Sequence, residues 1–216
     1  MAADHLTSTS IHEAAHATIS HVIGEEIEYM EITGERDGIT MPFHSPCRLC
    51  GSAVPEGQAC PECFRYYGKN RPSADARSAD INRAYRIEAA VAAAGELAEA
   101  KFNNGVLLAS EEELEDDRDR VSSRASLRHL WQGDSCANYC CADADCPTCE
   151  RSAEELRAEV RNLLNDETIW AGITGLAEHL KTAHRRLSGA EVRRFLEDRG
   201  VTFASHPIDS IWPPLP

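Results

Sequence analysis

Residues 7 to 21 most constrain the fold of this chain, because they read as a helix whose core-facing side carries two histidines. In the stretch SIHEAAHA, His12 and His16 stand four positions apart, which is about one helical turn. At about 100° per residue, His16, Ile19 and Ile23 all lie within roughly 40° of the direction of His12. The two imidazoles therefore share the buried side of the helix, where both can bind one metal ion.

The same stretch is the motif HExxH, and its glutamate, Glu13, follows His12 by about a quarter of a turn. In this motif the two imidazoles hold zinc, while the glutamate acts on a metal-bound water. The alternative is an alanine-rich helix that carries two histidines by chance, since five positions alone form a weak signal. Other parts of the sequence have to decide between the two interpretations.

The acidic charge of the chain excludes two broad classes of partner. The 216 residues include 36 acidic and 22 basic side chains, with a net charge of -14. Non-specific binding to nucleic acid or to an anionic membrane requires a positive surface, so we expect neither partner. The sequence also lacks an apolar run of membrane-spanning length and the basic, apolar start of a signal peptide. We therefore expect a soluble, cytoplasmic protein.

Nine cysteines fall in two tight groups with CxxC spacings, whereas a secreted disulfide scaffold would spread them along the chain. Such clustering is typical of metal sites in a reducing compartment. The first group forms two CxxC knuckles around a short loop, and we expect it to close a tetrahedral site for structural zinc. Its ligands are Cys47, Cys50, Cys60 and Cys63.

The second group offers five thiols where one tetrahedral zinc site needs four. We expect a second structural zinc, with the CxxC knuckle at the end of the group as half of the site. An iron-sulfur site and redox sensing by the spare thiol are the alternatives. The five residues are Cys136, Cys140, Cys141, Cys146 and Cys149.

Hydrophobic periodicity predicts a mainly α (α+β) fold with one small β-hairpin or sheet. The segments EIEYMEIT and DGITMPF read as two short strands around a turn at residues 34–38. The first helix is expected to be capped by a run of Ser and Thr and to end at Gly24, with His21 on its surface. Three further helices are expected over residues 81–102, from about residue 153, and over residues 167–181. Two more helices are expected to begin at capping boxes. One follows Ser110 and Glu113 in the acidic segment, and the other runs from Ser188 and Glu191 to Gly200. The expected apolar face of the helix over residues 81–102 consists of Ile87, Val91, Ala94, Ala98 and Phe102.

A catalytic zinc ion needs a third protein ligand from outside HExxH. The acidic segment has an apolar stripe made of Leu114, Val121, Ala125 and Trp131. Asp117 projects near this stripe, whereas Asp116 and Asp119 fall on the solvent side. A carboxylate on an apolar face requires a partner, and a metal ion would provide one. Asp117 is therefore the expected ligand, and Glu96 and Glu99 remain the alternatives.

Several of these segments, in this order, resemble the FtsH-type zinc peptidases. SIHEAAHATISHVIG looks like the helix with the motif HEAGHA, and EIEYMEITGERDGIT is similar to the strand pair that follows that helix. AAVAAAGELAEAKF resembles the alanine-rich helix written AGRAAEE, and LEDDRDRVSSRA resembles the helix with the aspartate ligand. WAGITGLAEHLKTAHRRLSGAEV resembles the C-terminal pair of helices. The resemblance covers most of the chain outside the cysteine groups.

The resemblance implies a helical HExxH metallopeptidase domain in which His12, His16 and Asp117 hold the catalytic zinc and Glu13 is the catalytic acid and base. One catalytic and one or two structural Zn2+ ions are the expected cofactors. The expected layout is a metallopeptidase-like domain over residues 1–43, 71–135 and 150–205, an inserted zinc ribbon over 44–70, a second cysteine knuckle over 136–149 and an extended tail over 206–216.

The expected function is that of a zinc endopeptidase, which hydrolyses a peptide or protein substrate through a metal-activated water and without ATP. Ala15 replaces the glycine of the family motif, two cysteine modules are inserted, and no GxxxxGK[ST] phosphate loop occurs in the chain. An extended substrate is expected to add as a strand beside YMEIT. The alternatives are a non-catalytic zinc-binding interaction or regulatory protein on a peptidase scaffold, and a regulatory protease that acts on a repressor.

Overall fold

The computed structural model describes residues 4–35, 37–42, 74–108, 147–182 and 186–213, together with residues 114, 115, 117, 118 and 121 of the acidic segment. Within these residues the protein is mainly helical with a small antiparallel sheet, which confirms the expected α+β class. The first cysteine group, the second group up to Cys146, and the capping pair of Ser110 and Glu113 lie outside the described residues. The two structural zinc sites therefore stay predictions.

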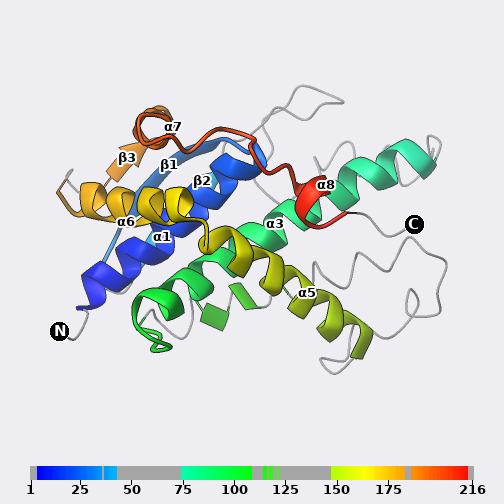
Figure 1. The fold of residues 1–216 in the computed structure, drawn as a ribbon, viewed down its shortest axis with the longest axis horizontal. Coiled ribbons are helices and arrows are strands. Elements are labelled where there is room, and N and C mark those ends of the chain that lie inside the picture. Colours follow the sequence, from blue (N-terminus) through cyan, green and yellow to red (C-terminus); the bar gives the residue numbers. More distant parts are fainter. Residues whose placement is uncertain are drawn as a thin grey trace.

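Helix α1 (His5–Ile23) packs against α3, α6 and the sheet (Figure 1). The other helices are α3 (Ala74–Phe102), α5 (Pro147–Leu164), α6 (Glu167–Thr182), α7 (Gly189–Glu197) and α8 (Ile208–Ile211). The strands are β1 (Ile27–Ile32), β2 (Gly38–Pro42) and β3 (Arg186–Ser188). No helix among the described residues has the length and apolar character needed to cross a membrane.

Helix α1 is buried on all sides. It begins after Asp4, whose side chain accepts a backbone hydrogen bond, and it ends at Gly24 in the left-handed conformation, with φ 89°. The cap is thus Asp4 rather than the Ser/Thr run, because the helix begins earlier than expected and takes that run into its interior. Every residue from Ser8 to Ile23 is buried, as is typical of a helix surrounded by other elements.

The sheet has the order β2-β1-β3, and both pairings are antiparallel. The β1–β2 hairpin confirms the predicted strand pair, with Met30 opposite Thr40 and Ile32 opposite Gly38. Strand β3 was not expected, because its three residues are too few for an alternating pattern. Since β3 pairs with the other side of β1, YMEIT is the central strand. The expectation that a substrate adds beside YMEIT is therefore wrong, and β2 is an edge of the described sheet.

Several helix boundaries differ from those expected. Helix α3 begins at Ala74 rather than at residue 81, and α5 begins at Pro147 rather than near residue 153. A proline is favourable in a first helical turn, because its missing N–H has no partner there in any case. Helix α6 and the capping box of α7 are as predicted, although α7 ends at Glu197, before Gly200. Phe102 is 36% exposed, so the predicted apolar face of α3 does not continue to the end of that helix.

The prediction of an extended tail over residues 206–216 is wrong for the part that the structure describes. The chain forms α8 and packs beside α3 (Figure 1), with Ile208 and Trp212 buried. Arg86 of α3 donates hydrogen bonds to the Trp212 carbonyl at 2.5 Å and to Asp209 Oδ1 at 2.6 Å. This buried guanidinium fixes the tail to the core, an interaction between segments 123 positions or more apart that no local pattern predicts.

Candidate metal centre

Two elements that are distant in sequence bring three potential metal ligands together. His12 and His16 extend from α1, and Asp117 comes from the acidic segment. Asp117 Oδ2 lies 3.1 Å from His12 Nε2 and 3.3 Å from His16 Nε2. One ligand atom from each residue lies within 4.8 Å of the other two, and all three residues are buried. This is the one such group of three or more metal-binding side chains among the described residues.

The helical spacing and one backbone carbonyl orient the two imidazoles. The rings are nearly perpendicular, at 81°, with centroids 4.6 Å apart. His16 Nδ1 lies 2.7 Å from the Val91 carbonyl oxygen. Because a carbonyl only accepts, Nδ1 carries the hydrogen and donates it, so Nε2, which faces Asp117, is the nitrogen that can bind a metal ion when it is deprotonated. A ligating histidine typically makes this second hydrogen bond.

Glu99 of α3 lies behind His12, on the side away from Asp117. Its Oε2 is 3.5 Å from His12 Nδ1, and both side chains are fully buried. Glu99 Oε1 accepts hydrogen bonds from the Ser8 hydroxyl, at 2.7 Å, and from the Leu108 amide. The carboxylate is thus held on both sides and can orient the His12 ring, in the way that outer carboxylates orient metal-binding histidines.

The two glutamates that were alternatives for the third ligand therefore have other contacts. Glu99 faces the far nitrogen of His12. Glu96 forms a two-point ion pair with Arg118, at 3.2 and 3.3 Å. Since Arg118 directly follows Asp117, this pair attaches the ligand-bearing segment to α3. Neither glutamate belongs to the convergent group.

Gly95 makes room for the His12 ring. A Cβ atom at this position would lie 2.4 Å from His12 Nε2 and 2.6 Å from Cε1, far inside van der Waals contact. A glycine inside a helix costs about 1 kcal/mol relative to alanine, and α3 has one in the middle of an alanine-rich run. Close approach of a ligand side chain explains why this position lacks a side chain.

Glu13 lies next to the metal-binding group without being part of it. Its side chain is turned toward strand β2, where the Thr40 hydroxyl donates a hydrogen bond of 2.6 Å to Oε2. Gly38 of the same strand passes so close that a Cβ there would lie 2.4 Å from Glu13 Cγ. The glutamate is 2% exposed, and its carboxylate is available for acid-base chemistry because it is not one of the ligands.

Burial and neighbouring charges shift the pKa values of His12, His16 and Asp117 in opposite directions. Burial lowers the pKa of His12, but contacts with Asp117 and Glu99 raise this pKa well above its usual range. For His16, burial also lowers the pKa, and the charge of Asp117 outweighs it, so the pKa is raised. Burial raises the pKa of Asp117, yet the nearby His16 and His12 bring it far below its ordinary value. An incoming cation therefore competes with protons on the imidazoles, and its binding releases them.

The donor set of the three side chains suits a divalent metal ion such as zinc. Two imidazole nitrogens and one carboxylate oxygen form the donor set of zinc sites that keep a fourth position for water. Asp117 Oδ2 is buried, and its close polar neighbours are the two imidazole nitrogens at 3.1 and 3.3 Å. A buried carboxylate requires positive charge nearby, and a metal ion bound by all three side chains would supply it. The space that Gly95 leaves for His12 is consistent with the same arrangement.

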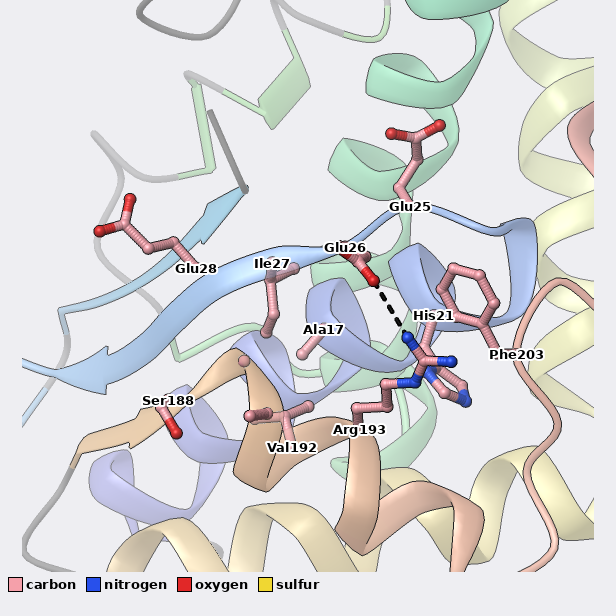
Figure 2. Close-up of a pocket in the computed structure, with 12 residues that line it drawn as sticks. Ala17, His21, Glu25, Glu26, Ile27, Glu28, Ser188, Val192, Arg193 and Phe203 are labelled. Atoms are coloured by element: carbon pink, nitrogen blue, oxygen red, sulfur yellow. Dashed lines mark hydrogen bonds and ion pairs between the residues drawn. The ribbon is translucent and has the colours of Figure 1, made fainter. Parts of the chain in front are cut away.

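A separate hollow lies on another side of α1 (Figure 2). It is lined by Ala17 and His21, which point about 140° and 180° away from His12 around the helix. His21, expected on the surface, is 4% exposed, and its Nε2 lies 3.1 Å from the Val201 carbonyl. Arg193 on the rim pairs with Glu26 at 3.0 Å. The hollow contains none of the three side chains of the convergent group, so it is not the candidate site.

The sequence pattern predicted the three side chains that converge, but it did not predict the residues that contact them. Leu114 and Val121 are buried as the stripe predicted, and Asp117 is 6% exposed. Asp116, Asp119, Ala125 and Trp131 lie outside the residues whose structure is described. The roles of Glu99, Gly95 and Thr40 were not predicted, because each depends on a contact with α1 from a distant element. Of these three, Gly95 alone could have been noticed from a local pattern, because it is a glycine within an alanine-rich helix.

Comparisons with known proteins do not assign a family to this chain. No protein-family model matches the chain, and no curated protein matches it significantly.

Proposed function

We propose that the protein is a zinc-dependent endopeptidase of the kind its sequence resembles, the FtsH-type zinc peptidases. The observation that carries this proposal is the convergence of His12, His16 and Asp117 in a buried group, with Glu13 beside it but outside the ligand set. A purely structural zinc site fills all four positions with protein ligands. A three-ligand group with an adjacent buried carboxylate is suited to hydrolysis.

Different residues have separate roles in the proposed reaction. His12, His16 and Asp117 would hold a zinc ion, which would supply the Lewis acidity that activates water and polarises a carbonyl group. Glu13 accepts a proton from the attacking water and delivers it to the nitrogen of the leaving amine. Oε1 of Glu13 serves as the base, since Oε2 already accepts the hydrogen bond from Thr40. Glu99 and the Val91 carbonyl keep the two imidazoles oriented.

The substrate is an extended peptide segment that lies along β2. This strand is an edge of the described sheet, and it contacts α1 at Glu13. An edge strand offers unpaired backbone groups to which a peptide can add as a further strand. Such binding selects for extended conformation more than for sequence, so we expect cleavage of unstructured polypeptides.

Removal of the metal tests the proposal directly. The purified full chain should contain zinc beyond the amount that the cysteine groups hold, and it should cleave an unstructured protein such as casein. A zinc chelator should abolish cleavage, and added zinc should restore it. Metal content is measured by elemental analysis and cleavage by release of labelled peptides. A zinc-loaded chain that cleaves no unstructured protein would instead support the non-catalytic alternative.

Substitution of Asp117 by asparagine tests the ligand assignment. The change retains the shape but removes the charge that draws the cation, so zinc affinity at this site should fall by more than about 100-fold. We expect this large effect because loss of a residue that only supports a ligand already lowers metal affinity about 10- to 100-fold. Affinity is measured by competition with a zinc-binding dye. Glu115→Gln, at an exposed position on the same segment, is the matched control and should bind zinc as the unmodified protein does; equal affinity in Asp117→Asn would contradict the assignment.

A further inference from the structure

We propose that Thr40 is a positioning residue, which holds the Glu13 carboxylate through Oε2 and leaves Oε1 to act as the base. This inference rests on the proposed peptidase function. It concerns a residue of the strand and not of the HExxH helix, and it assigns to β2 a role in arranging the catalytic group as well as in contacting substrate.

Strand β2 supplies the hydrogen bonds and one of the close approaches that Glu13 makes among the described residues. The Thr40 hydroxyl lies 2.6 Å from Glu13 Oε2 and 3.1 Å from the Glu13 carbonyl oxygen. These two acceptors belong to the same residue, so the hydroxyl reaches both the backbone and the side chain of Glu13. Gly38, two positions earlier on β2, bounds the carboxylate on another side, with its Oε1 2.9 Å from where a Cβ would lie. The strand therefore forms a cradle for this side chain, made of Gly38 and Thr40.

The register of the hairpin sets the position of the cradle. Thr40 lies opposite Met30 and Gly38 opposite Ile32 on β1. Met30 and Ile32 are core residues, 0% and 3% exposed. Side chains alternate between the two faces of a strand, so Gly38 and Thr40 share a face of β2. The register that sets these two positions opposite core residues of β1 therefore also turns the Thr40 hydroxyl to Glu13.

A glutamate needs such a restraint to act as a base. Its side chain has three rotatable bonds, and ordering it costs up to about 2 kcal/mol of conformational entropy. A hydrogen bond to a charged carboxylate is roughly twice as strong as one between neutral groups, which offsets part of this cost. Displacement of a catalytic group by about 1 Å can reduce the rate about 100-fold. A threonine is suited to this task because its branched side chain has restricted rotation about χ1.

Three variants separate positioning from a purely structural role. Thr40→Val keeps the branched shape but loses the hydroxyl, so kcat for casein peptides should fall about 10- to 100-fold, while KM and zinc content stay unchanged. Thr40→Ser retains the hydroxyl and should restore most of the kcat. Thr33→Val is the matched control, because Thr33 also donates from its hydroxyl in this hairpin, to the Asp37 carbonyl, and does not contact Glu13.

A second measurement reports on the contact without relying on activity. In the full chain labelled with carboxyl-13C glutamate, the Glu13 signal is assigned by its loss in Glu13→Gln. We expect this signal to shift in Thr40→Val, to return close to its original position in Thr40→Ser, and to stay in place in Thr33→Val. The Gly38→Ala variant should also shift it, because the added Cβ displaces the side chain.

These results would distinguish failure of this inference from failure of the proposed function. An active, zinc-loaded protein in which Thr40→Val leaves both kcat and the Glu13 signal unchanged would overturn the role of Thr40. An unchanged kcat together with a raised KM would also overturn it, since positioning of a base acts on the chemical step. A chain without hydrolytic activity would contradict the peptidase proposal, and an unshifted Glu13 signal in Thr40→Val would still refute the cradle.

Discussion

Glu13→Gln is expected to abolish peptide hydrolysis while the zinc content stays the same. Glutamine has nearly the shape of glutamate, and its side-chain carbonyl can still accept the hydrogen bond that the Thr40 hydroxyl donates. The amide cannot accept a proton from water at neutral pH. General acid-base catalysis contributes about 100- to 10,000-fold to a rate, so we expect kcat to fall at least about 100-fold.

The zinc content should not change, because Glu13 is outside the group formed by His12, His16 and Asp117. Elemental analysis and cleavage of labelled casein on the same preparation measure both quantities. Glu28→Gln, an exposed position on β1, is the control for loss of one acidic side chain and should retain full activity. Unchanged cleavage by the Glu13→Gln protein would refute the proposed mechanism, even if the zinc site were intact.

Gly95→Ala is expected to remove zinc from the same site although Gly95 is not a ligand. The new methyl group would lie 2.4 Å from His12 Nε2, so the imidazole has to shift from the position in which Nε2 faces Asp117. His12 is fully buried among α1, α3 and Glu99, and the ring has little space for that movement. Loss of a direct ligand should lower zinc affinity by more than the roughly 10- to 100-fold effect of an outer-shell change.

The same substitution tests the packing independently of the metal. A Gly→Ala change in a helix interior normally increases the free energy of unfolding by about 1 kcal/mol, whereas overpacking a core decreases it by about 1–3 kcal/mol. We expect the second effect to outweigh the first at position 95. Gly175→Ala in α6 is the matched control, because its nearest neighbour is the flexible end of Arg199 at 3.1 Å. Chemical unfolding and dye competition measure stability and zinc affinity; a Gly95→Ala protein with normal zinc affinity would mean that His12 is not held against α3.

Local sequence patterns were sufficient to predict the helix and the strand pair that form the candidate site. The four-residue spacing of His12 and His16 and the apolar direction of their helix follow from helical geometry alone. The position of Asp117 follows from the same rule, because the neighbouring stripe residues Leu114 and Val121 are buried as predicted. The hairpin was also predictable, since its two segments alternate around a turn. Each of these features depends on residues close together in sequence.

Contacts between distant segments were not predictable in the same way. Strand β3 has three residues, and its pairing with β1 depends on the whole chain between them. Helix α1 was expected to have one buried side, but α3, α6 and the sheet cover it on all sides. This difference explains why His21 is buried and why YMEIT is the central strand. It also explains the tail, whose anchor Arg86 lies on a helix far away in sequence.

The sequence by itself determined which side chains are candidates for the metal, because ligand type and helical spacing are local properties of the chain. The tertiary structure alone decided how those side chains are supported. Glu99 behind His12, Gly95 beneath its ring and Thr40 against Glu13 come from three positions on α3 and β2. Their contacts with α1 depend on how closely each element packs against that helix. Such distances result from the packing of the whole core, and no pattern within a single segment contains them.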